Sequence, residues 1–566
     1  MSIAKYDMNK FLPFITIVIL FFINAESFGQ TLPVGLLDGT EDNLRRQQLL
    51  GNDSSRSSFM IRPLNISDRN NFLLDSNQNI YLDGFRKKIY SANNDKTAVY
   101  LLPVTWQQQI NTHHPYGWND GSMIQARGYQ TQISVGVYAK FGPLSIQLRP
   151  EYVYAENKDF RELQEAGNGD AFLKKYAQVA NRIDNPERFG NSPYSKLDWG
   201  QSSIRLTFDP VSIGLSNENL WWGPGVRNSL LMSNTASGFK HISLNTSRPV
   251  NTPVGSFETQ IVAGVLKGSR ITIDNALFTA KRNNWRYFSG IAFTYQPKWI
   301  PNLFLGFDRS FIVYRNDMGN SFGDYFPLFS PVEKVTINDG QNGEDSRKRD
   351  QYASFFARWV MPESRAEVYF QYGRNDHPYD LRDALQEPEH SRAYIAGFRK
   401  LVPLKKNNEF IQVGLELTQM EGARTGEGRA QPSWYVHHQV RDGYTNNGQV
   451  LGAGIGPGSN LQSLDVSWVK GLKRIGIQLE RLVNNNDLYY FAITTDNRRK
   501  WIDLSFSGKF DWTYKSFILN SQLSYIRSHN YQYTIKGVSP SKDQFWNWDK
   551  QDINNLHLKV GLMYRW

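Results

Sequence analysis

Two adjacent tryptophans, Trp221 and Trp222, stand in a segment that reads NENLWWGPGVRNSLLMSNTASGF over residues 217–239. Indole rings offer broad apolar faces for stacking. The polar side chains that follow and offer hydrogen bonds are those of Arg227, Asn228 and Asn234. The Gly-Pro-Gly after the tryptophans fits neither a helix nor a regular strand. The segment predicts either a contact surface for a ligand or a tight turn in which the two indoles pack as structural wedges.

A second group of chemically versatile residues is HHPYGWND, over residues 113–120. Metal ligation by His113 and His114 is the first hypothesis that this group raises. Adjacent histidines on an extended segment point to opposite faces, so they rarely chelate one ion. The pair at 437–438 is discounted for the same reason, and we predict no metal site. Tyr116 and Trp118 stay as candidate ligand contacts.

The chain carries no strong catalytic or cofactor motif. The glycine-rich stretch GQVLGAGIGPGSN at 448–460 has no Lys-Ser/Thr after it, which a phosphate-binding loop requires. There is no His-Glu-x-x-His, and the one Gly-x-Ser-x-Gly match, GNSFG at 319–323, is a short pattern that is not by itself evidence of a hydrolase. With no cysteine, thiol catalysis and disulfides are excluded. We therefore predict a protein that is not an enzyme and holds no cofactor.

The N-terminus predicts export. Lys5 and Lys10 precede the apolar run FLPFITIVILFFINA, and Ser27 and Gly29 occupy the small-residue positions of a cleavage site before Gln30. A membrane anchor is the alternative, but a run of about 15 residues is shorter than the roughly 20 of a spanning helix. We predict a signal peptide over residues 1–29. The net charge of +11 favours acidic partners, and export argues against nucleic acid.

The composition suits strands that cross an outer membrane. Mean hydropathy is −0.52, which is too polar for a bundle of membrane helices, yet 14% of the residues are aromatic. The last segment, LHLKVGLMYRW at 556–566, alternates apolar and largely polar residues and ends on an aromatic residue. Such an end resembles the terminal strand that outer-membrane assembly machinery recognises.

The same alternation recurs along the chain. The segments that carry it are ISVGVYAKF (133–141), LSIQLRPEYVY (144–154), SIRLTF (203–208), YFSGIAFTY (287–295), AEVYFQY (366–372), FIQVGLELT (410–418), IGIQLE (475–480), IDLSFSGKF (502–510) and FILNSQLSY (517–525). From 129 to 566, about 440 residues hold about 18 strands at roughly 24 residues per strand and connection. The sequence thus predicts an all-β fold, a large transmembrane antiparallel β-barrel over residues 129–566.

Two segments break the strand pattern. TEDNLRRQQLLG at 40–51 predicts a short helix that Thr40 caps and Gly51 ends, and DAFLKKYAQVANRI at 170–183 predicts a second one. Residues 30–128 are therefore expected to form an N-terminal periplasmic piece with a small helical segment, followed by the first strands. Such a piece belongs at the periplasmic mouth, because a barrel this wide encloses a lumen that must be lined or plugged.

Four blocks of sequence carry a family resemblance. They are LLPVTWQQQINTHHPYGWNDGSMIQARGYQT (101–131), FGPLSIQLRPEYVYAENKDF (141–160), NLWWGPGVRNSLLMSN with GFKHISLNTSRPVNTPVGSFE (219–258) and GYTNNGQVLGAGIGPGSN (443–460). On these blocks the chain resembles the Wzi-like capsule assembly family of outer-membrane proteins, in its Bacteroidota branch. The resemblance implies a monomeric outer-membrane barrel with helices on the periplasmic side. It also implies a lectin-like role in holding capsular polysaccharide or exopolysaccharide.

Together these observations predict a non-catalytic protein of a Gram-negative outer membrane that binds surface polysaccharide. The alternative is a porin-like conduit for export or uptake of oligosaccharides, which needs a continuous wet lumen. Expected partners are the polysaccharide, outer-membrane lipid or lipopolysaccharide, and the barrel assembly machinery. The candidate glycan contacts are Trp221, Trp222, Arg227, Asn228, Asn234, Tyr116 and Trp118.

The basic side chains on the predicted inner faces leave two interpretations open. Arg149, Arg205, Lys559 and Arg565 all lie on the polar sides of predicted strands. A basic lumen suits an anionic polysaccharide, because lumen residues set selectivity in barrels. The alternative is that the interior carries mixed and mutually paired charges.

Overall fold

The computed structural model describes most of the 566 residues. The described ranges are 30–35, 38–52, 56–66, 73–75, 80–81, 86–329, 348–375, 381–406, 408–424, 433–493, 497–535, 546–547 and 549–566. The signal peptide that the sequence predicts over residues 1–29 lies outside them.

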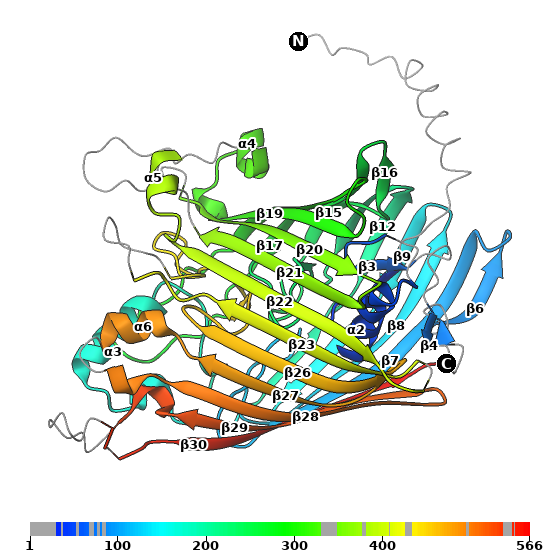
Figure 1. Ribbon diagram of the computed structural model, residues 1–566. Helices are drawn as coiled ribbons and strands as arrows, with labels where there is room; N and C mark the ends of the chain where they lie inside the picture. Colours follow the sequence, from blue (N-terminus) through cyan, green and yellow to red (C-terminus); the bar gives the residue numbers. More distant parts are fainter. Residues whose placement is uncertain are drawn as a thin grey trace, which may run out of the picture.

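A closed antiparallel β-barrel of 18 strands makes up the wall (Figure 1). Its strands in chain order are β7 (Thr97–Asn111), β8 (Gly128–Phe141), β9 (Leu144–Leu148) continued by β10 (Glu151–Ala155), β11 (Tyr194–Asp198) continued by β12 (Ser203–Phe208), β13 (Val211–Ser216), β15 (His241–Thr246), β17 (Gly255–Leu266), β18 (Arg286–Pro297), β19 (Leu303–Tyr314), β20 (Asp350–Met361), β21 (Ala366–Asn375), β22 (Arg392–Pro403), β23 (Phe410–Gln419), β26 (Asn460–Lys470), β27 (Lys473–Val483), β28 (Ile502–Tyr514), β29 (Phe517–His529) and β30 (Ile553–Tyr564). The last strand, β30, pairs with β7 and closes the ring. The predicted all-β barrel and its strand number are confirmed.

Alternation of side chains explains why these segments form the wall. On β27 the apolar Ile475, Ile477 and Leu479 face outward and are exposed, whereas Gln478 and Glu480 between them point inward and are buried. An outward apolar band with polar residues inside is the pattern of a barrel in a lipid bilayer. All the segments in which the sequence shows this alternation lie in wall strands.

One predicted strand is interrupted. The segment LSIQLRPEYVY forms β9 and β10 with a break at Pro150, which has no N–H to donate to a neighbouring strand. β8 pairs with both parts, so the wall stays continuous. The break lets the Arg149 backbone bond instead to Ser202 and Gln201 beside it.

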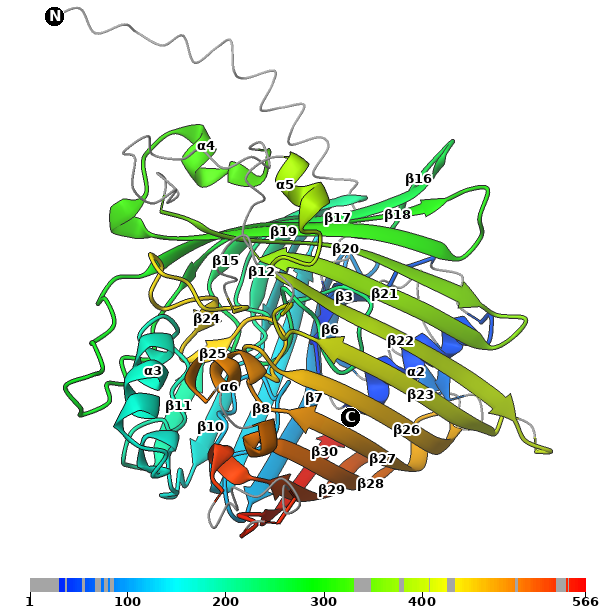
Figure 2. The same cartoon turned by 60° about the vertical axis from the view of Figure 1, so that its left-hand side comes forward.

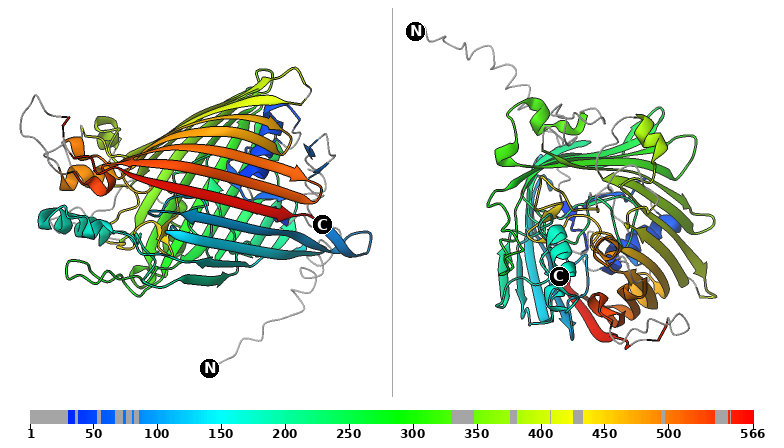
Figure 3. Two further views of the ribbon diagram at one scale, coloured as in Figure 1. Left: turned by 90° about the horizontal axis from the view of Figure 1, so that it is seen from below. Right: turned by 90° about the vertical axis from the view of Figure 1, so that its left-hand side faces the viewer.

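The two ends of the barrel differ in the length of their connections (Figure 3). At one end, neighbouring strands are joined by tight turns, such as those between Met361 and Ala366 and between Tyr514 and Phe517. Long connections lie at the other end, which we assign to the extracellular side because barrels carry short periplasmic turns and longer extracellular loops. The chain ends at the short-turn end, near the hairpin of β6 (Lys87–Ala92) and β7 (Figure 3).

Helices lie at both ends of the barrel. The helix predicted over 40–51 is α2 (Asp38–Leu49), close to the short-turn end, where Gly51 lies near Pro362. The other helices follow long connections: η3 (Leu163–Glu165), α3 (Asp170–Ala180), η4 (Arg315–Asp317), α4 (Phe322–Tyr325), η5 (Pro327–Phe329), α5 (Leu381–Gln386), α6 (Asn486–Ala492), η6 (Asn497–Arg499) and η7 (Tyr531–Tyr533). The resemblance implies helices on the periplasmic side, and most of the described helices lie on the extracellular side. Among the described helices, none is long and apolar enough to cross a membrane.

Helix α2 of the N-terminal segment lies inside the wall. Arg45 of α2 forms an ion pair with Glu367, a fully buried residue on the inner face of β21. Arg358 of β20 donates to the Gln48 side chain. The short strands of this segment are β1 (Gln30–Leu32), β2 (Ile61–Arg62), β3 (Leu64–Ile66), β4 (Leu73–Asp75) and β5 (Ile80–Tyr81). Charge-assisted hydrogen bonds therefore attach α2 to the barrel interior.

Loops from the extracellular side fill the rest of the interior. The connections over residues 112–127, 217–240 and 433–459 contribute most of the large apolar cluster at the centre of the molecule. Its largest fully buried members include Trp222, Trp434, Tyr435 and Tyr444. These loops contain β14 (Trp221–Trp222), β24 (Thr445–Asn446) and β25 (Gln449–Val450). We call these three loops together the plug.

Candidate functional site

The tryptophan segment crosses the interior as part of the plug. Its strand β14 pairs with β2 of the N-terminal segment, with Trp221 opposite Arg62 and Trp222 opposite Ile61. The Gly223 amide donates to the Met60 carbonyl oxygen at 2.8 Å. Segments about 160 residues apart in the chain therefore share backbone hydrogen bonds. These bonds provide partners for the backbone N–H and C=O groups of an irregular stretch that neither a regular strand nor bulk water could pair.

Trp222 is enclosed on all sides. Its side chain has no exposed surface, and its indole Nε1 donates to Gln260 Oε1 at 2.7 Å. Its ring packs against Phe288, and a Cβ at Gly290 would lie 2.6 Å from the indole. The residue is a packing element between the plug and strands β17 and β18.

Trp221 lies against a different surface. The Arg62 guanidinium stacks over its ring at 4.4 Å, and Arg62 forms an ion pair with Glu41 at 3.3 Å. The indole is 3% exposed and lines a cavity in the interior. The two adjacent tryptophans thus face opposite ways, one into the apolar cluster and one toward a polar space.

The turn after the tryptophans is fixed by a single carboxylate. Glu416, on the inner face of β23, accepts hydrogen bonds from the backbone N–H groups of Val226, Arg227 and Asn228 at 2.7–3.2 Å. It also accepts from the Tyr369 hydroxyl at 2.8 Å. Glycine is needed at 225, because a Cβ there would lie 1.9 Å from the Asn228 carbonyl oxygen.

The polar candidates of the segment bond mainly within the protein. The Arg227 guanidinium forms an ion pair with Glu480 at 2.8 Å and stacks over the Trp118 ring at 4.7 Å. Asn228 is fully buried and donates to Thr418 Oγ1. Asn234 donates to the Asn119 carbonyl oxygen at 2.9 Å. These residues join the loop at 217–240 to the barrel wall and to the loop at 112–127.

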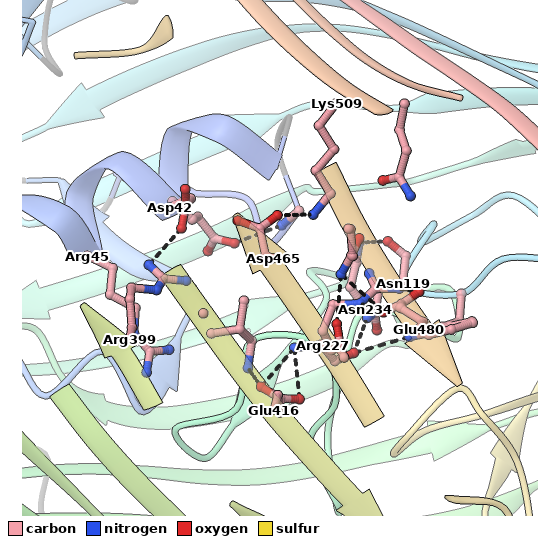
Figure 4. Close-up of a pocket in the computed structure, with 18 of the residues that line it drawn as sticks. Asp42, Arg45, Asn119, Arg227, Asn234, Arg399, Glu416, Asp465, Glu480 and Lys509 are labelled. Atoms are coloured by element: carbon pink, nitrogen blue, oxygen red, sulfur yellow. Dashed lines mark hydrogen bonds and ion pairs between the residues drawn. The ribbon is translucent and has the colours of Figure 1, made fainter. Parts of the chain in front are cut away.

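Five of the seven predicted residues line one cavity of about 170 Å³ in the barrel interior (Figure 4). They are Tyr116, Trp118, Trp221, Arg227 and Asn234. Trp222 and Asn228 lie outside its lining. The cavity is bounded by α2, by the plug and by the inner faces of wall strands, and we call it the chamber.

Sequence reasoning missed the charged half of the chamber, which comes from α2 and the wall. Asp42 on α2 pairs with Arg399 of β22 at 2.7 Å, and Lys509 of β28 pairs with Asp465 of β26 at 3.0 Å (Figure 4). The alternation of strands predicts inward polar residues, but no signal in one sequence indicates which ones meet.

The interior charges are mixed and mostly paired, which agrees with the second of the two interpretations of the sequence. Arg205 pairs with Glu218 at 2.7 Å, and Lys559 pairs with Asp120 at 2.9 Å. Arg149 is buried among Ser134, Thr105 and a backbone carbonyl oxygen. Arg565 lies at the short-turn end and donates to the Lys515 carbonyl oxygen. A uniformly basic lumen is therefore not what the chain builds.

The histidines at 113–114 do not point to opposite faces as expected, because their Nδ1 atoms lie 3.2 Å apart. Burial lowers the pKa of His114 to about 3. Within the described ranges, no group of three or more histidine, aspartate or glutamate side chains is placed to hold a metal ion.

A sequence model of the capsule assembly protein Wzi family matches residues 106–534, about three quarters of the chain. The chain belongs to this family. A search of curated proteins finds no match. Among solved structures, the barrel is similar to Wzi of Escherichia coli, described as an outer-membrane, carbohydrate-binding β-barrel involved in group 1 capsule assembly. The TM-score is 0.55 and the identity 15%, over 95% of this chain and 99% of that one.

OpdK of Pseudomonas aeruginosa and OccAB3 of Acinetobacter baumannii also match, at 9% and 11% identity and TM-scores of 0.37 and 0.38. The matches cover 82% and 83% of this chain and 98% and 100% of the others. Membership of the Wzi family and the barrel fold identify the protein as an outer-membrane β-barrel of the capsule assembly class.

Proposed function

We propose that this Wzi-family barrel is a non-catalytic anchor that binds capsular polysaccharide or exopolysaccharide at the extracellular face. The observation that carries the proposal is the filled interior: α2 and the plug occupy the space that a conduit needs open. Wzi of Escherichia coli is a carbohydrate-binding β-barrel, and this supports carbohydrate as the ligand class of this chain.

The chamber is small for a polymer. Ligand pockets commonly have volumes of ~300–1,000 Å³, and the chamber measures about 170 Å³ with its charged groups in ion pairs. We therefore assign to Trp221, Trp222 and Trp118 the role of bracing the plug. The polymer contacts are proposed for the extracellular rim.

The rim offers aromatic rings and cations side by side where α3 and α6 pack together (Figure 2). Lys175 lies over the Phe491 ring at 4.1 Å, and Arg424 lies over the Tyr490 ring at 3.6 Å. Lys500 lies 5.3 Å from the same tyrosine. Aromatic faces stack on apolar surfaces and cations attract acidic groups, so this surface suits a polymer that contains acidic sugars.

The test is retention of the organism's own purified surface polysaccharide by the detergent-solubilised protein. We expect the wild type to retain it and Tyr490→Ala/Phe491→Ala to retain at least tenfold less. Trp118→Leu/Trp221→Leu, which changes the chamber, is expected to retain it normally. Loss with the chamber variant alone would move the contacts to the tryptophans, and no retention by the wild type would contradict anchoring.

A further inference from the structure

Two arginines face each other on the outside of the barrel. Arg374 of β21 and Arg392 of β22 are register partners, near the end of each strand that leads into the long connection. On the same face of these strands lie Val368, Phe370 and Phe398, which are exposed to the surroundings of the barrel. Both arginines therefore point outward, at the extracellular boundary of the wall.

This arrangement places two positive charges directly opposite each other. Side chains directly opposite on neighbouring strands have Cβ atoms roughly 4.5–5.5 Å apart, and like charges there are destabilising. Within the described part of the chain, no carboxylate forms an ion pair with either arginine. The Arg392 guanidinium donates to the Glu421 carbonyl oxygen at 3.4 Å and lies over the Tyr394 ring at 5.7 Å. The Nε atom of Arg374 is buried without a hydrogen-bond partner.

The neighbouring strands extend the positive row. Arg374 is opposite Ala353 of β20, and Ala353 is opposite Arg309 of β19. Arg309 is already engaged with Leu328 and Gln351 through hydrogen bonds of 3.2 and 2.9 Å. Ala353, between Arg374 and Arg309, carries only a methyl side chain and is partly exposed.

An aromatic row lies directly toward the membrane from the arginines. Tyr372 and Tyr394 are the next outward residues on the two strands, and Phe355 on β20 is 64% exposed. Aromatic girdles mark the two edges of the apolar band of a barrel. The arginines consequently lie at the level where lipid headgroups begin and acyl chains end.

We propose that Arg374 and Arg392 bind a phosphate group of an outer-leaflet glycolipid, whose acyl chains pack on the aromatic row. Guanidinium groups bind phosphate through paired N–H donors. One phosphate between the two side chains neutralises the cross-strand repulsion and accepts hydrogen bonds from their guanidinium groups. This lipid site is separate from the polysaccharide surface and does not depend on it.

The experiment uses the full barrel in nanodiscs with bisphosphorylated lipid A, and native mass spectrometry counts the lipid that stays bound. We expect Arg374→Gln/Arg392→Gln to lower the apparent affinity at least tenfold. Lys400→Gln is the matched control, because Lys400 lies outward on β22 at the opposite end. It is expected to bind as the wild type does.

The second arm uses lipid A without its phosphate groups. We expect this lipid to bind the wild type weakly, with an affinity similar to that of intact lipid A for the double variant. Folding is checked by the heat-dependent gel mobility of the barrel. If the double variant does not fold, the single variants replace it, each with an expected severalfold loss. Equal retention by wild type and variants, or equal binding of the phosphate-free lipid, would overturn the proposal.

Discussion

At the scale of single residues, two neighbouring tryptophans have different roles. Trp222 fills the centre of the apolar cluster and makes a hydrogen bond to Gln260, whereas Trp221 lies beneath the Arg62 guanidinium at the edge of the chamber. The sequence leaves two hypotheses for this pair, a contact surface for a ligand and structural wedges in a tight turn. The burial of Trp222 supports a wedge for that residue, since a sugar has no surface of it to reach.

Trp222→Ala should therefore destabilise the folded barrel. Removing a fully buried indole leaves a cavity and an unpaired Gln260, and core truncations of this size cost about 3–5 kcal/mol. The measurement is the free energy of unfolding in urea, followed by tryptophan fluorescence in lipid. Trp299→Ala is the control, because Trp299 is 67% exposed at the β18–β19 turn, and a change of at most about 0.5 kcal/mol is expected there. Equal effects of the two substitutions would contradict the wedge role.

At the scale of elements, the plug loop depends on the carboxylate of Glu416. Three backbone N–H groups donate to its two oxygens. A glutamine at this position would replace one acceptor oxygen by an N–H₂ donor, which cannot accept from these N–H groups. Glu416→Gln is expected to cost about 1–3 kcal/mol of local stability. Hydrogen exchange of the amides at 226–228 should become faster.

Glu409→Gln on the same strand hairpin is the matched change, because Glu409 pairs with Lys470 near the surface. Exposed ion pairs contribute about 0–1 kcal/mol, so exchange in the plug loop should stay unchanged. If Glu416→Gln leaves the exchange at 226–228 as slow as in the wild type, the carboxylate does not fix the turn.

A second element, helix α3, is attached through Glu187. Glu187 accepts hydrogen bonds from the Tyr176 hydroxyl at 2.7 Å and from the Leu163 amide. Burial raises the pKa of Glu187 from 4.5 to about 7. Because the pKa of Glu187 is higher in the folded form, protonation of this carboxyl group favours the folded form. This contribution to the stability of α3 is complete below about pH 4.5 and is lost as pH rises through about 7.

Hydrogen exchange in α3, corrected for the intrinsic pH dependence, should therefore be slower at pH 5 than at pH 8. The side chain keeps some solvent contact, so we expect a local difference of only about 1 kcal/mol. Glu187→Gln cannot titrate and is expected to make the corrected exchange independent of pH. A pH dependence that persists in this variant would assign the effect to another group.

The strands were predictable from the sequence because each one carries its own period-two pattern. Examples are Ile475, Ile477 and Leu479 on the outward face of β27. The helix at 38–49 was predictable from Gly51 behind it, but Thr40 lies inside the helix and is not its cap. The helix at 170–180 has no side-chain cap, because Gly169 is its N-cap residue. The plug was not, because its contacts join residues such as Arg227 and Glu480 that are far apart in the chain. One sequence holds no record of such pairings.

For the whole molecule, the wall and the plug form one unit. The wall presents both carboxylates, such as Glu367, and arginines, such as Arg399, and α2 presents Arg45 and Asp42 to them. The loop at 217–240 presents backbone N–H groups to Glu416. The five candidates that line the chamber were found by residue type. The charged residues of the same lining, Asp42, Arg399 and Lys509, come from elements that the motif search did not connect. The pairing of charges across the interior is what closes a lumen that the strand number alone would leave wide.

A filled lumen predicts that the barrel does not conduct. In planar bilayers the purified wild type should give no steady open current, because ions have no continuous wet path. Replacing residues 221–234 by a flexible glycine-serine linker removes the wedge and the contacts to Glu416 and Glu480, and this variant should show open currents. The same variant should still retain the polysaccharide if the rim holds it. Steady currents from the wild type would contradict the plugged anchor and favour the conduit, since only an open lumen passes ions.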